Sequence, residues 1–542
     1  MMKDELANAV RNALVTLEIL PAGDPLLDRV EVSQPQSREH GDWATNAALV
    51  TSKAAGRNPR EVAADLVAHM EANPPRHLAA MEIAGPGFIN FRLQPGWLHD
   101  VLSATATSSP DDFGAHHFGE GTHINVEFVS ANPNGPLHGG HARGAIYGDA
   151  MARLFAKCGY QVTREDYLND RGVQMKNYTD SLVAARAGEP TPEDGYAGQY
   201  VTDWANEIPA EITEWQDVFA WGYARALQSH KDTLAAIQVH HDVFFSERSL
   251  MESGAVESVL DRLAELDKSF EADGATWLRS TDFGDDKDRV LIKSDGDLTY
   301  LTPDVAYHED KFSRADKLFN VWGADHHSYV VRMKAAMQAL GHQPDDLEIV
   351  VTQLVKLERD GVEEKMAKRT GEFVTIDEMV SEVGADAVRF TFLMQSMDTR
   401  QTIDLTALSE KSMDNPVFYV QYAHARIKQL GKNAAEAGVE CQPLDRTDLS
   451  VLTHDRELEV LRVLNEYPEQ VAIACRERAP HRITTWSREL ASAFHGFYRD
   501  CYVVGHDVTL EQTQARLWLI EAARVGLVSA LELVGVSAPD QM

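Results

Sequence analysis

The chain has few cysteines and lacks long apolar runs. Its four cysteines, Cys158, Cys441, Cys475 and Cys501, are scattered over 542 residues and form no Cys-x-x-Cys pair. We therefore expect neither a disulfide framework nor a zinc knuckle, and this usage is typical of a reducing cytoplasm. No run of about 18 apolar residues occurs, and the N-terminus lacks the apolar core of a secretory signal, so we expect no membrane span.

Basic charge is also scarce, because 51 Lys and Arg stand against 84 Asp and Glu, a formal net charge of -33. A nucleic-acid-binding protein usually carries a basic footprint, and this chain shows none overall. Two interpretations stay open: an acidic surface that aids solubility, or RNA contact confined to small basic patches. Screening limits surface fields to about 8–10 Å at physiological salt, so the net charge does not exclude the second. That interpretation predicts RNA binding that weakens steeply with added salt.

Length and patterning predict an α/β multidomain protein with three domains. Residues 1–110 mix helical stretches with short strands and predict a small α/β N-terminal domain. Residues 115–400 alternate strand and helix patterns, which predicts a Rossmann-like parallel sheet, with a mostly helical insertion near 180–280. Residues 401–542 have almost no strand pattern, and their long amphipathic stretches predict an all-α helical bundle.

Within the middle domain, individual elements are predicted from apolar periodicity and from Gly and Pro positions. The predicted strands are 124–129, 161–168, 318–322 and 347–354, and the predicted helices are 140–157 and 329–340. In the last domain the predicted helices cover 411–432, 454–476, 481–503 and 509–535. This β-α-β alternation favours a parallel, doubly wound sheet.

The most informative stretch is 126–141, which reads as a buried strand, a Pro/Gly loop and a helix opening on His-Gly-Gly-His. A helix N-terminus after a strand is a ready phosphate site. His138 and His141, three apart, project from one side of the first turn, where imidazoles can donate to phosphate oxygens. Gly139 and Gly140 remove side chains where a nucleotide would approach the backbone. A surface His pair or an incomplete metal site is the alternative, and the preceding strand and loop disfavour it.

A second motif, Lys-Met-Ala-Lys-Arg at 365–369, is followed by glycine at Gly371. Lys365 and Lys368 can neutralise a departing pyrophosphate, and Met366 is placed to cover an adenine. Preorganised charge of this kind is usually the largest catalytic contribution. An ordinary basic loop is the alternative, but the stretch 375–378 fits a capping box and makes this a defined strand-to-helix connection.

These two motifs resemble the His-Ile-Gly-His and Lys-Met-Ser-Lys signatures of class I aminoacyl-tRNA synthetases, and the chain as a whole resembles the arginyl-tRNA synthetase family. The further stretches that carry the resemblance are 85–90, 126–141, 167–174, 300–307, 323–327 and 415–427. The resemblance covers nearly the whole chain, except the inserted region and the linkers. The chain departs from the family pattern at Gly139, Ala367 and Ser328. These departures bear on the rate of the reaction more than on membership of the family.

The resemblance implies an N-terminal domain that touches the tRNA elbow, a Rossmann-like catalytic domain and a helical anticodon-binding domain. It implies that arginine, ATP and tRNA(Arg) give arginyl-tRNA, AMP and pyrophosphate, and that bound tRNA precedes arginine activation. ATP would enter with Mg²⁺ as a substrate complex, with no tightly bound cofactor and no zinc or other resident metal. A cytoplasmic monomer without membrane contact is the family expectation.

Substrate chemistry agrees, because a guanidinium is a planar cation with five donors that carboxylates match. The resemblance assigns Glu127 and Asp304 to the guanidinium, Tyr300 to a contact against it, and Ser130 and Asn132 to the α-amino and carboxylate groups. A solvent-facing Glu127 is disfavoured in a strand covered on both faces, whereas Asp304 after a proline can also be a cap. We expect Glu127→Gln to abolish most arginine affinity and to leave ATP binding intact.

The resemblance also assigns the remaining site residues. Catalysis falls to His138, His141, Lys365 and Lys368; ATP binding to Pro136, His138, Gly140, His141, Met366 and Lys368; and the signature loop to Ala131, Asn132, Pro133, Asn134, Gly135, Pro136, Leu137, His138, Gly139, Gly140 and His141. For tRNA, it assigns Phe88 and Asn90 to the D-loop and Tyr419, Gln421, Tyr422 and Met542 to the anticodon. A packed Phe88, a turn at Asn90 and an apolar helix face at Tyr419 and Tyr422 are the structural alternatives.

Two other functions stay open on the sequence. A small-molecule adenylyltransferase would use the same histidine chemistry, but such enzymes are short and need no helical C-terminal domain. A tRNA-binding paralogue without catalysis is disfavoured by the intact His138/His141 and Lys365/Lys368 pairs. Charging of tRNA with an amino acid distinguishes an aminoacyl-tRNA synthetase from both alternatives.

Overall fold

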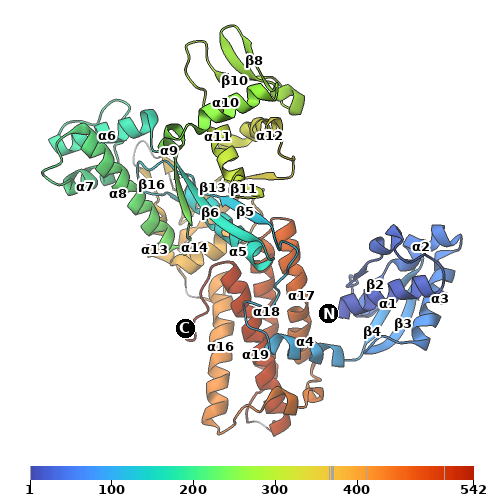
Figure 1. The fold of residues 1–542 in the computed structure, drawn as a ribbon. Coiled ribbons are helices and arrows are strands. Elements are labelled where there is room, and N and C mark those ends of the chain that lie inside the picture. The colour runs from blue at the N-terminus through green and yellow to red at the C-terminus, as the bar shows by residue number, and fades with distance from the viewer. Residues whose placement is uncertain (1, 365, 368–371, 411, 506) are drawn as a thin grey trace. The chain divides into compact units, whose positions relative to one another are not determined.

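The computed structural model describes residues 2–364, 366–367, 372–410, 412–505 and 507–542. The chain forms two compact units, each assembled from segments far apart in the sequence. The first contains residues 1–107, 434–465 and 496–522; the second contains 108–433, 466–495 and 523–542. Figure 1 gives the course of the chain through these elements.

The first unit opens with a small α/β fold, as predicted. Its helices are α1 (Met2–Thr16), α2 (Ala47–Ala55), α3 (Pro59–Ala72) and α4 (Gly96–Ala106), and its strands are β1 (Val32–Ser33), β2 (Trp43–Thr45), β3 (Leu78–Ala84) and β4 (Phe88–Leu93). The antiparallel sheet has the order β1-β2-β4-β3. Asn58 caps α3 by accepting from the backbone N–H of Arg60, and Pro59 fills the first helical position, where its missing N–H costs nothing.

The second unit is built on a five-stranded, entirely parallel sheet, which confirms the predicted Rossmann-like fold. Its strands are β5 (His123–Glu127), β6 (Gln161–Leu168), β7 (Val243–Ser246), β11 (Lys317–Trp322) and β12 (Leu347–Val351), in the order β12-β11-β5-β6-β7. The connecting helices include α5 (Gly139–Lys157), α11 (Leu301–Phe312) and α12 (Val330–Ala339). The chain leaves β5 toward one edge and returns through β11 to the other, so the strand order reverses between β5 and β11. In open α/β sheets, ligands bind at such a switch point.

The segment predicted as a helical insertion is more varied than expected. Its helices are α6 (Gly172–Ala187), α7 (Gln199–Glu207), α8 (Trp215–Ala236), α9 (Glu247–Glu252) and α10 (Ala255–Glu265). Between α8 and α9, however, β7 pairs in parallel with β6 and forms the edge of the main sheet. Strands β8 (Ser269–Ala272), β9 (Ala275–Leu278) and β10 (Arg289–Ile292) make a separate antiparallel sheet. The predicted range 180–280 is mostly helical, as expected, and it also contains the three short strands β7, β8 and β9, which were not predicted.

Short elements connect the parallel sheet to the C-terminal helices. They are β13 (Val355–Arg359), β14 (Val362–Glu363), β15 (Met366–Ala367), β16 (Glu372–Phe373), α13 (Ile376–Val383), α14 (Ala385–Phe392), β17 (Gln401–Asp404) and α15 (Leu405–Ser409). The four predicted amphipathic stretches are helices: α16 (Pro416–Glu436), α17 (Asp455–Arg476), α18 (His481–Asp500) and α19 (Leu510–Leu533). The expectation of an all-α region from residue 401 is corrected at its start, because β17 pairs in parallel with β13.

A buried ionic network fixes α5, the helix that begins at the His-Gly-Gly-His motif. Asp149 Oδ2 accepts from Arg389 Nη2 at 2.5 Å and from Arg153 Nε at 2.8 Å. Arg389, which is fully buried, also donates to the carbonyl oxygens of Ile237 at 2.7 Å and Val534 at 2.9 Å. The guanidinium thereby joins α5 to the ends of α8 and α19.

Arg389→Met should destabilise this unit strongly. Removing one partner of a buried pair leaves an under-compensated charge and typically costs about 3–5 kcal/mol, which lowers the midpoint of thermal unfolding by on the order of 5 °C or more. The matched control is Arg482→Met, because Arg482 makes an exposed 2.9 Å pair with Glu477 worth at most about 1 kcal/mol. Equal unfolding midpoints for the two variants would contradict the structural role of Arg389.

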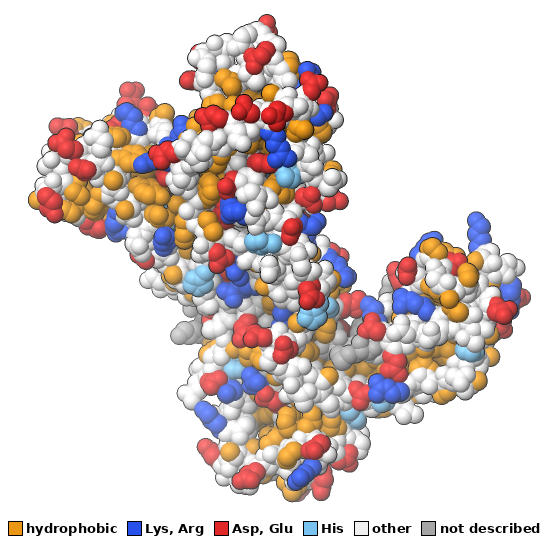
Figure 2. All heavy atoms as spheres, viewed as in Figure 1, with side chains coloured by type: hydrophobic (Ala, Val, Ile, Leu, Met, Phe, Trp, Pro, Cys, Tyr) orange, Lys and Arg blue, Asp and Glu red, His pale blue; other side chains and the backbone are white. Residues whose placement is uncertain are grey.

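The surface carries charge of both signs. Acidic and basic side chains are interspersed over the face shown in Figure 2. Among the described residues, no helix combines the length and the apolar character needed to cross a membrane.

Candidate active site

The loop after β5 begins with a strained turn. Val129 and Ser130 both adopt positive φ, at 76° and 42°, a conformation that is unfavourable for non-glycine residues and especially for a β-branched one. Such a backbone conformation costs on the order of 1–3 kcal/mol per residue, and residues that adopt it cluster at functional sites. The turn directs residues 131–138 from the end of β5 to the start of α5.

His138 and His141 form the cap of α5. His138 Nδ1 accepts from the backbone N–H of Gly140 at 3.1 Å, and His141 Nδ1 accepts from the backbone N–H of His138 at 3.2 Å. The two ring centroids are 3.9 Å apart. Because each Nδ1 is an acceptor, each neutral ring carries its hydrogen on Nε2. Nε2 is therefore the donor atom that each histidine can present to an anion at this helix N-terminus.

The segment that follows the second motif docks against the first. The backbone N–H of Gly139 donates to the carbonyl of Val374 at 2.9 Å, and that of Ile376 donates to the carbonyl of Leu137 at 3.0 Å. The predicted capping box is present, since Glu378 N–H donates to Thr375 Oγ1 at 3.0 Å and Thr375 N–H donates to Glu378 Oε2 at 2.7 Å. The backbone segments next to the two motifs therefore pair with each other, although the motifs are more than 220 residues apart in the sequence.

The second motif itself is only partly described. Met366 and Ala367 form β15, which pairs with β16 in an antiparallel hairpin. The predicted cations Lys365, Lys368 and Arg369 lie outside the described residues.

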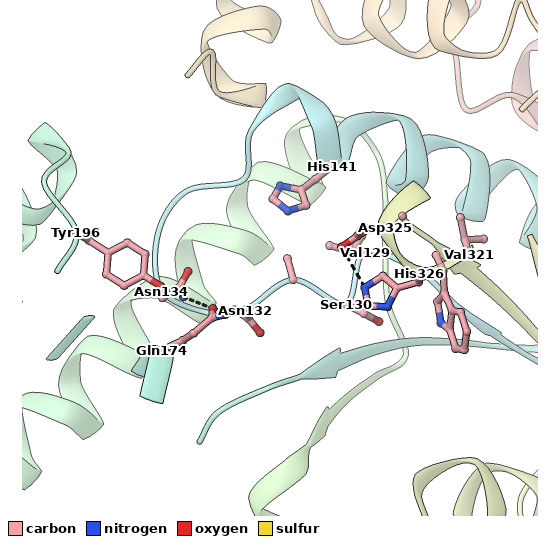
Figure 3. Close-up of a pocket in the computed structure, with 13 residues that line it drawn as sticks. Val129, Ser130, Asn132, Asn134, His141, Gln174, Tyr196, Val321, Asp325 and His326 are labelled. Carbon is pink, nitrogen blue, oxygen red and sulfur yellow. Dashed lines mark hydrogen bonds and ion pairs between the residues drawn. The ribbon is translucent and has the colours of Figure 1, made fainter. Parts of the chain in front are cut away.

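A pocket of about 420 Å³ lies at the switch point between β5 and β11, within the size range of small-molecule sites. Its lining residues are Val129, Ser130, Ala131, Asn132, Asn134, His141, Gln174, Tyr196, Val321, Trp322, Gly323, Asp325 and His326. In Figure 3, Asn132, Gln174 and Tyr196 lie on one side, Asp325 and His326 lie on the other, and His141 points in from α5. The predicted signature loop therefore forms one wall of a polar cavity.

Helices α6 to α8 hold the signature loop in place. Gln174 Oε1 accepts from Asn132 Nδ2 at 2.6 Å and from Asn134 Nδ2 at 3.3 Å. Asn134 is further bound by Tyr196 and Tyr200, since its Nδ2 donates to Tyr196 at 2.9 Å and its carbonyl accepts from Tyr200 at 3.0 Å. Gln174 belongs to one of the stretches that carry the family resemblance, but no role was predicted for it.

Gly135, in the middle of the loop, is restricted by the same helices. A Cβ atom on Gly135 would lie 2.8 Å from the Tyr200 hydroxyl, and its carbonyl is 2.8 Å from His230 Nε2. Any other residue here would have to push the Tyr200 ring aside, together with its hydrogen bond to the Asn134 carbonyl. Of the other predicted nucleotide contacts, Pro136 is partly buried and Gly140 is exposed.

Glu127, the first predicted guanidinium ligand, is buried and paired with a cation of the protein. Its Oε2 lies 2.5 Å from Lys311 Nζ, and its Oε1 accepts from Ser130 Oγ at 2.9 Å. Lys311 is fully buried on α11 and also donates to Asn320 Oδ1 at 2.9 Å. Lys311 was not predicted as a site residue, because a lone lysine on a helix is ordinarily taken as exposed.

Asp304, the second predicted guanidinium ligand, lies in the first turn of α11 and is partly buried. It accepts from the Tyr329 hydroxyl at 2.7 Å. Burial, followed by the nearby carboxylates of Glu247 and Glu127, raises the pKa of Asp304 to about 7. Tyr300, one turn earlier, is 89% exposed. The ionised form of such a buried carboxylate is stabilised when a cation lies beside it.

The predicted tRNA contacts differ in accessibility. Phe88 is 40% exposed, whereas Asn90 is buried in β4. On α16, the Tyr419 ring packs 4.7 Å from His495, and Tyr422 lies under the guanidinium of Arg426 at 4.3 Å.

Gln421 is buried, and its Nε2 donates to Asp386 Oδ2 at 2.7 Å and to the Ser537 carbonyl at 3.0 Å. The tail that follows Ser537 ends at the exposed Met542. The amide of Gln421 is thus engaged within the protein, where it holds the C-terminal tail on α16.

Comparison with known proteins identifies relatives over the whole chain. Three family descriptions match: "Arginyl tRNA synthetase N terminal domain" at residues 2–93, "tRNA synthetases class I (R), catalytic domain" at 109–184 and 215–429, and "DALR anticodon binding domain" at 420–542. Arginine–tRNA ligase 1 of Halalkalibacterium halodurans is 42% identical, with 100% of this chain and 98% of that protein covered. Arginine–tRNA ligase of Bacillus subtilis is 41% identical, with 100% and 99% covered.

Solved structures agree with these matches. A putative arginyl-tRNA synthetase from Campylobacter jejuni has a TM-score of 0.75 and 35% identity, covering 83% of this chain and 100% of that chain. The arginyl-tRNA synthetase of Thermus thermophilus has a TM-score of 0.77 over 100% of both chains. At 20% identity, this second likeness shows the fold alone.

Proposed function

This chain belongs to the arginyl-tRNA synthetase family of class I aminoacyl-tRNA synthetases, and from that premise we propose how its residues attach arginine to tRNA. The chain is an arginine–tRNA ligase that supplies arginyl-tRNA for translation. The observation that carries this conclusion is identity of about 42% to arginine–tRNA ligases over the full chain. The histidine-capped helix at the switch point of the sheet is the matching chemical feature.

We propose that the first step is attack of the arginine carboxylate on the α-phosphate of ATP, which enters as its Mg²⁺ complex. The Nε2–H groups of His138 and His141 donate to the phosphate oxygens as charge develops, and Lys365 and Lys368 neutralise the departing pyrophosphate. Pro136, Gly140 and Met366 contact the nucleotide. Catalysis rests on positioning and electrostatic stabilisation, without a covalent enzyme intermediate.

In the second step, a ribose hydroxyl of the terminal tRNA adenosine attacks the carbonyl carbon of arginyl-adenylate. The carbonyl–phosphate oxygen bond breaks and AMP leaves. Ser130 and Asn132, which line the pocket, hold the α-amino and carboxylate groups of arginine during both steps. Asp304, Glu127 and Tyr300 hold the guanidinium.

We propose that tRNA contacts both ends of the chain. Exposed Phe88 stacks on an unpaired base of the elbow, since aromatic side chains are the usual platform for single-stranded RNA. Asn90 supports that strand from the buried side. Tyr419, Tyr422 and Met542 face the anticodon, and Gln421 acts through the tail that it holds. The protein works as a monomer in the cytoplasm.

The ion pair between Glu127 and Lys311 gives a test that separates folding from binding. Glu127→Gln leaves the Lys311 ammonium buried without its counter-charge, so we expect a loss of about 3–5 kcal/mol in stability. The double variant Glu127→Gln/Lys311→Met should recover most of that stability, because an apolar replacement of a buried pair is often neutral.

The Michaelis constant for arginine then decides the role of Glu127. If Glu127 contacts the guanidinium, KM stays raised in the double variant, while KM for ATP keeps its wild-type value. A double variant with wild-type KM for arginine would contradict the contact and leave Glu127 with a structural role only.

Pyrophosphate exchange tests the proposed function. We expect exchange between ATP and pyrophosphate with arginine, among the twenty amino acids, and only when tRNA is added. Exchange with another amino acid would contradict the substrate. Absence of exchange under every condition would contradict adenylate formation and favour a tRNA-binding protein without catalysis.

A further inference from the structure

Arg143 lies on α5, two residues beyond the His-Gly-Gly-His motif, and its side chain is buried although it carries a charge. Its Nη1 donates to the carbonyl of Gln353 at 3.0 Å, and its Nη2 donates to the carbonyls of Ser396 at 2.9 Å and Thr399 at 2.8 Å. In the described part of the chain, every hydrogen bond of this guanidinium runs to a backbone carbonyl. Burying a charge costs free energy unless hydrogen bonds compensate it, so the three carbonyls hold the guanidinium in one place.

The three carbonyls belong to two connections that are bonded to each other. Gln353 lies between β12 and β13, whereas Ser396 and Thr399 lie between α14 and β17. The backbone N–H of Gln353 donates to the carbonyl of Met397 at 3.3 Å, which joins the two connections. Strands β13 and β17 begin directly after them and pair in parallel. Arg143 therefore joins α5 to the start of both strands.

Strand β13 leads into the second motif. From β13 the chain turns through β14 into the hairpin β15/β16, which contains part of that motif. After the hairpin, the backbone returns to the start of α5 through the hydrogen bonds of Gly139 with Val374 and of Ile376 with Leu137. The second motif is thus tied to the helix of the first motif on both sides, and the upstream tie runs through Arg143.

The shape of a guanidinium suits such a tie. It is planar and presents its donors in a rigid fork, so it fixes both the distance and the direction of the carbonyls that it binds. An apolar side chain of similar volume would fill the same space without fixing either. Placement matters in this reaction, because catalysis rests on positioning and preorganised charge, and a displacement of about 1 Å caused far from the reacting atoms can cost about 10²-fold in rate.

We propose that Arg143 is a positioning residue for adenylate formation, which sets the place of the second motif relative to His138 and His141. This inference rests on the proposed function and adds a residue to it. The described residues that line the pocket do not include Arg143, so it acts through the backbone that it holds. The alternative is that Arg143 only stabilises the fold. A residue of that kind affects the midpoint of unfolding but not the kinetic constants of the folded enzyme.

The test compares two arginines of α5 that both bind backbone carbonyls. Arg153 donates to the carbonyls of Glu532 at 3.1 Å and Gln238 at 3.2 Å, which lie outside the two connections, so Arg153→Met is the matched control for Arg143→Met. Both full-length variants are assayed in arginine-dependent pyrophosphate exchange with tRNA, at a temperature below their unfolding midpoints. For Arg143→Met we expect kcat to fall about 10²-fold, with KM for arginine within about twofold of wild type. Arg153→Met should keep the wild-type kcat.

Arg143→Lys separates placement from charge. Lysine keeps the charge, but a single ammonium lacks the fork that holds both connections, so we expect kcat about tenfold below wild type with KM for arginine unchanged. A wild-type kcat in folded Arg143→Met, an equal fall of kcat in Arg153→Met, or a rise in KM for arginine that matches the fall in kcat would overturn the proposal. If Arg143→Met does not fold, Arg143→Lys decides by the same criteria. Absence of arginine-dependent exchange in the wild type would instead contradict the proposed function itself.

Discussion

Replacing His138 with asparagine should lower the rate of arginine-dependent pyrophosphate exchange by about 10²–10³-fold, as loss of one preorganised donor typically does. Asparagine is a good N-cap, so its side-chain oxygen can still accept from the backbone N–H of Gly140, as His138 Nδ1 does. The donor at Nε2 is lost, and the helix cap is kept. We therefore expect kcat to fall, with thermal stability within about 1 kcal/mol of wild type.

His141→Gln extends this test to the third helical position. Glutamine at N3 preserves a capping box and so replaces the acceptor that His141 Nδ1 offers to the backbone of His138. The matched control is His117→Asn, an exposed histidine that does not line the pocket. If either site variant kept more than a tenth of the wild-type rate, the donor role assigned to that histidine would be wrong.

The second large effect is expected for Asp304→Asn, which should raise KM for arginine about 10²-fold. Truncating one partner of a buried, hydrogen-bonded charge pair costs about 2–5 kcal/mol, and asparagine can still accept from the Tyr329 hydroxyl that now binds Asp304. KM for ATP should stay at the wild-type value. Asp297→Asn, an exposed carboxylate that precedes the same helix, is the control. Arginine kinetics unchanged in Asp304→Asn would remove this residue from the site.

The pH dependence gives an independent check of the same carboxylate. Because burial raises the pKa of Asp304 to about 7, its negative charge is present above that pH and is lost as pH falls through it. The charge attracts the cationic substrate, so kcat/KM for arginine should fall about tenfold per pH unit below 7 and level off above it. Asp304→Asn should abolish this ionisation from the profile. A profile that is flat in the wild type between pH 6 and 8 would contradict the assignment.

The backbone around the catalytic motif could be predicted from local sequence. The strand 161–168 was predicted to the residue, and α5 begins one residue before the predicted start. These elements have clear signals, because apolar periodicity sets their type and Gly or Pro sets their ends. Strand β7 has only four residues between two helices, so its pattern was too short to stand out from its surroundings.

The contacts that build the site are long-range, and a single sequence gives little access to them. Lys311 is 184 residues from Glu127, and the helical period of α11 shows which face is inward but not which buried carboxylate the ammonium will meet. Gln174 meets Asn132 across 42 residues for the same reason. The family resemblance identified Glu127 and Asp304 as site residues, and the structure adds their partners Lys311 and Tyr329. Lys365 and Lys368 stay predictions, because they lie outside the described residues.

Aminoacylation is the most direct test of the central claim. Purified protein is incubated with ATP, Mg²⁺, total tRNA and each of the twenty labelled amino acids in turn, and label in acid-precipitable tRNA is counted. We expect charging with arginine, and loss of nearly all charging in His138→Asn. Charging with a different amino acid, or arginine-specific charging that survives intact in His138→Asn, would contradict the central claim.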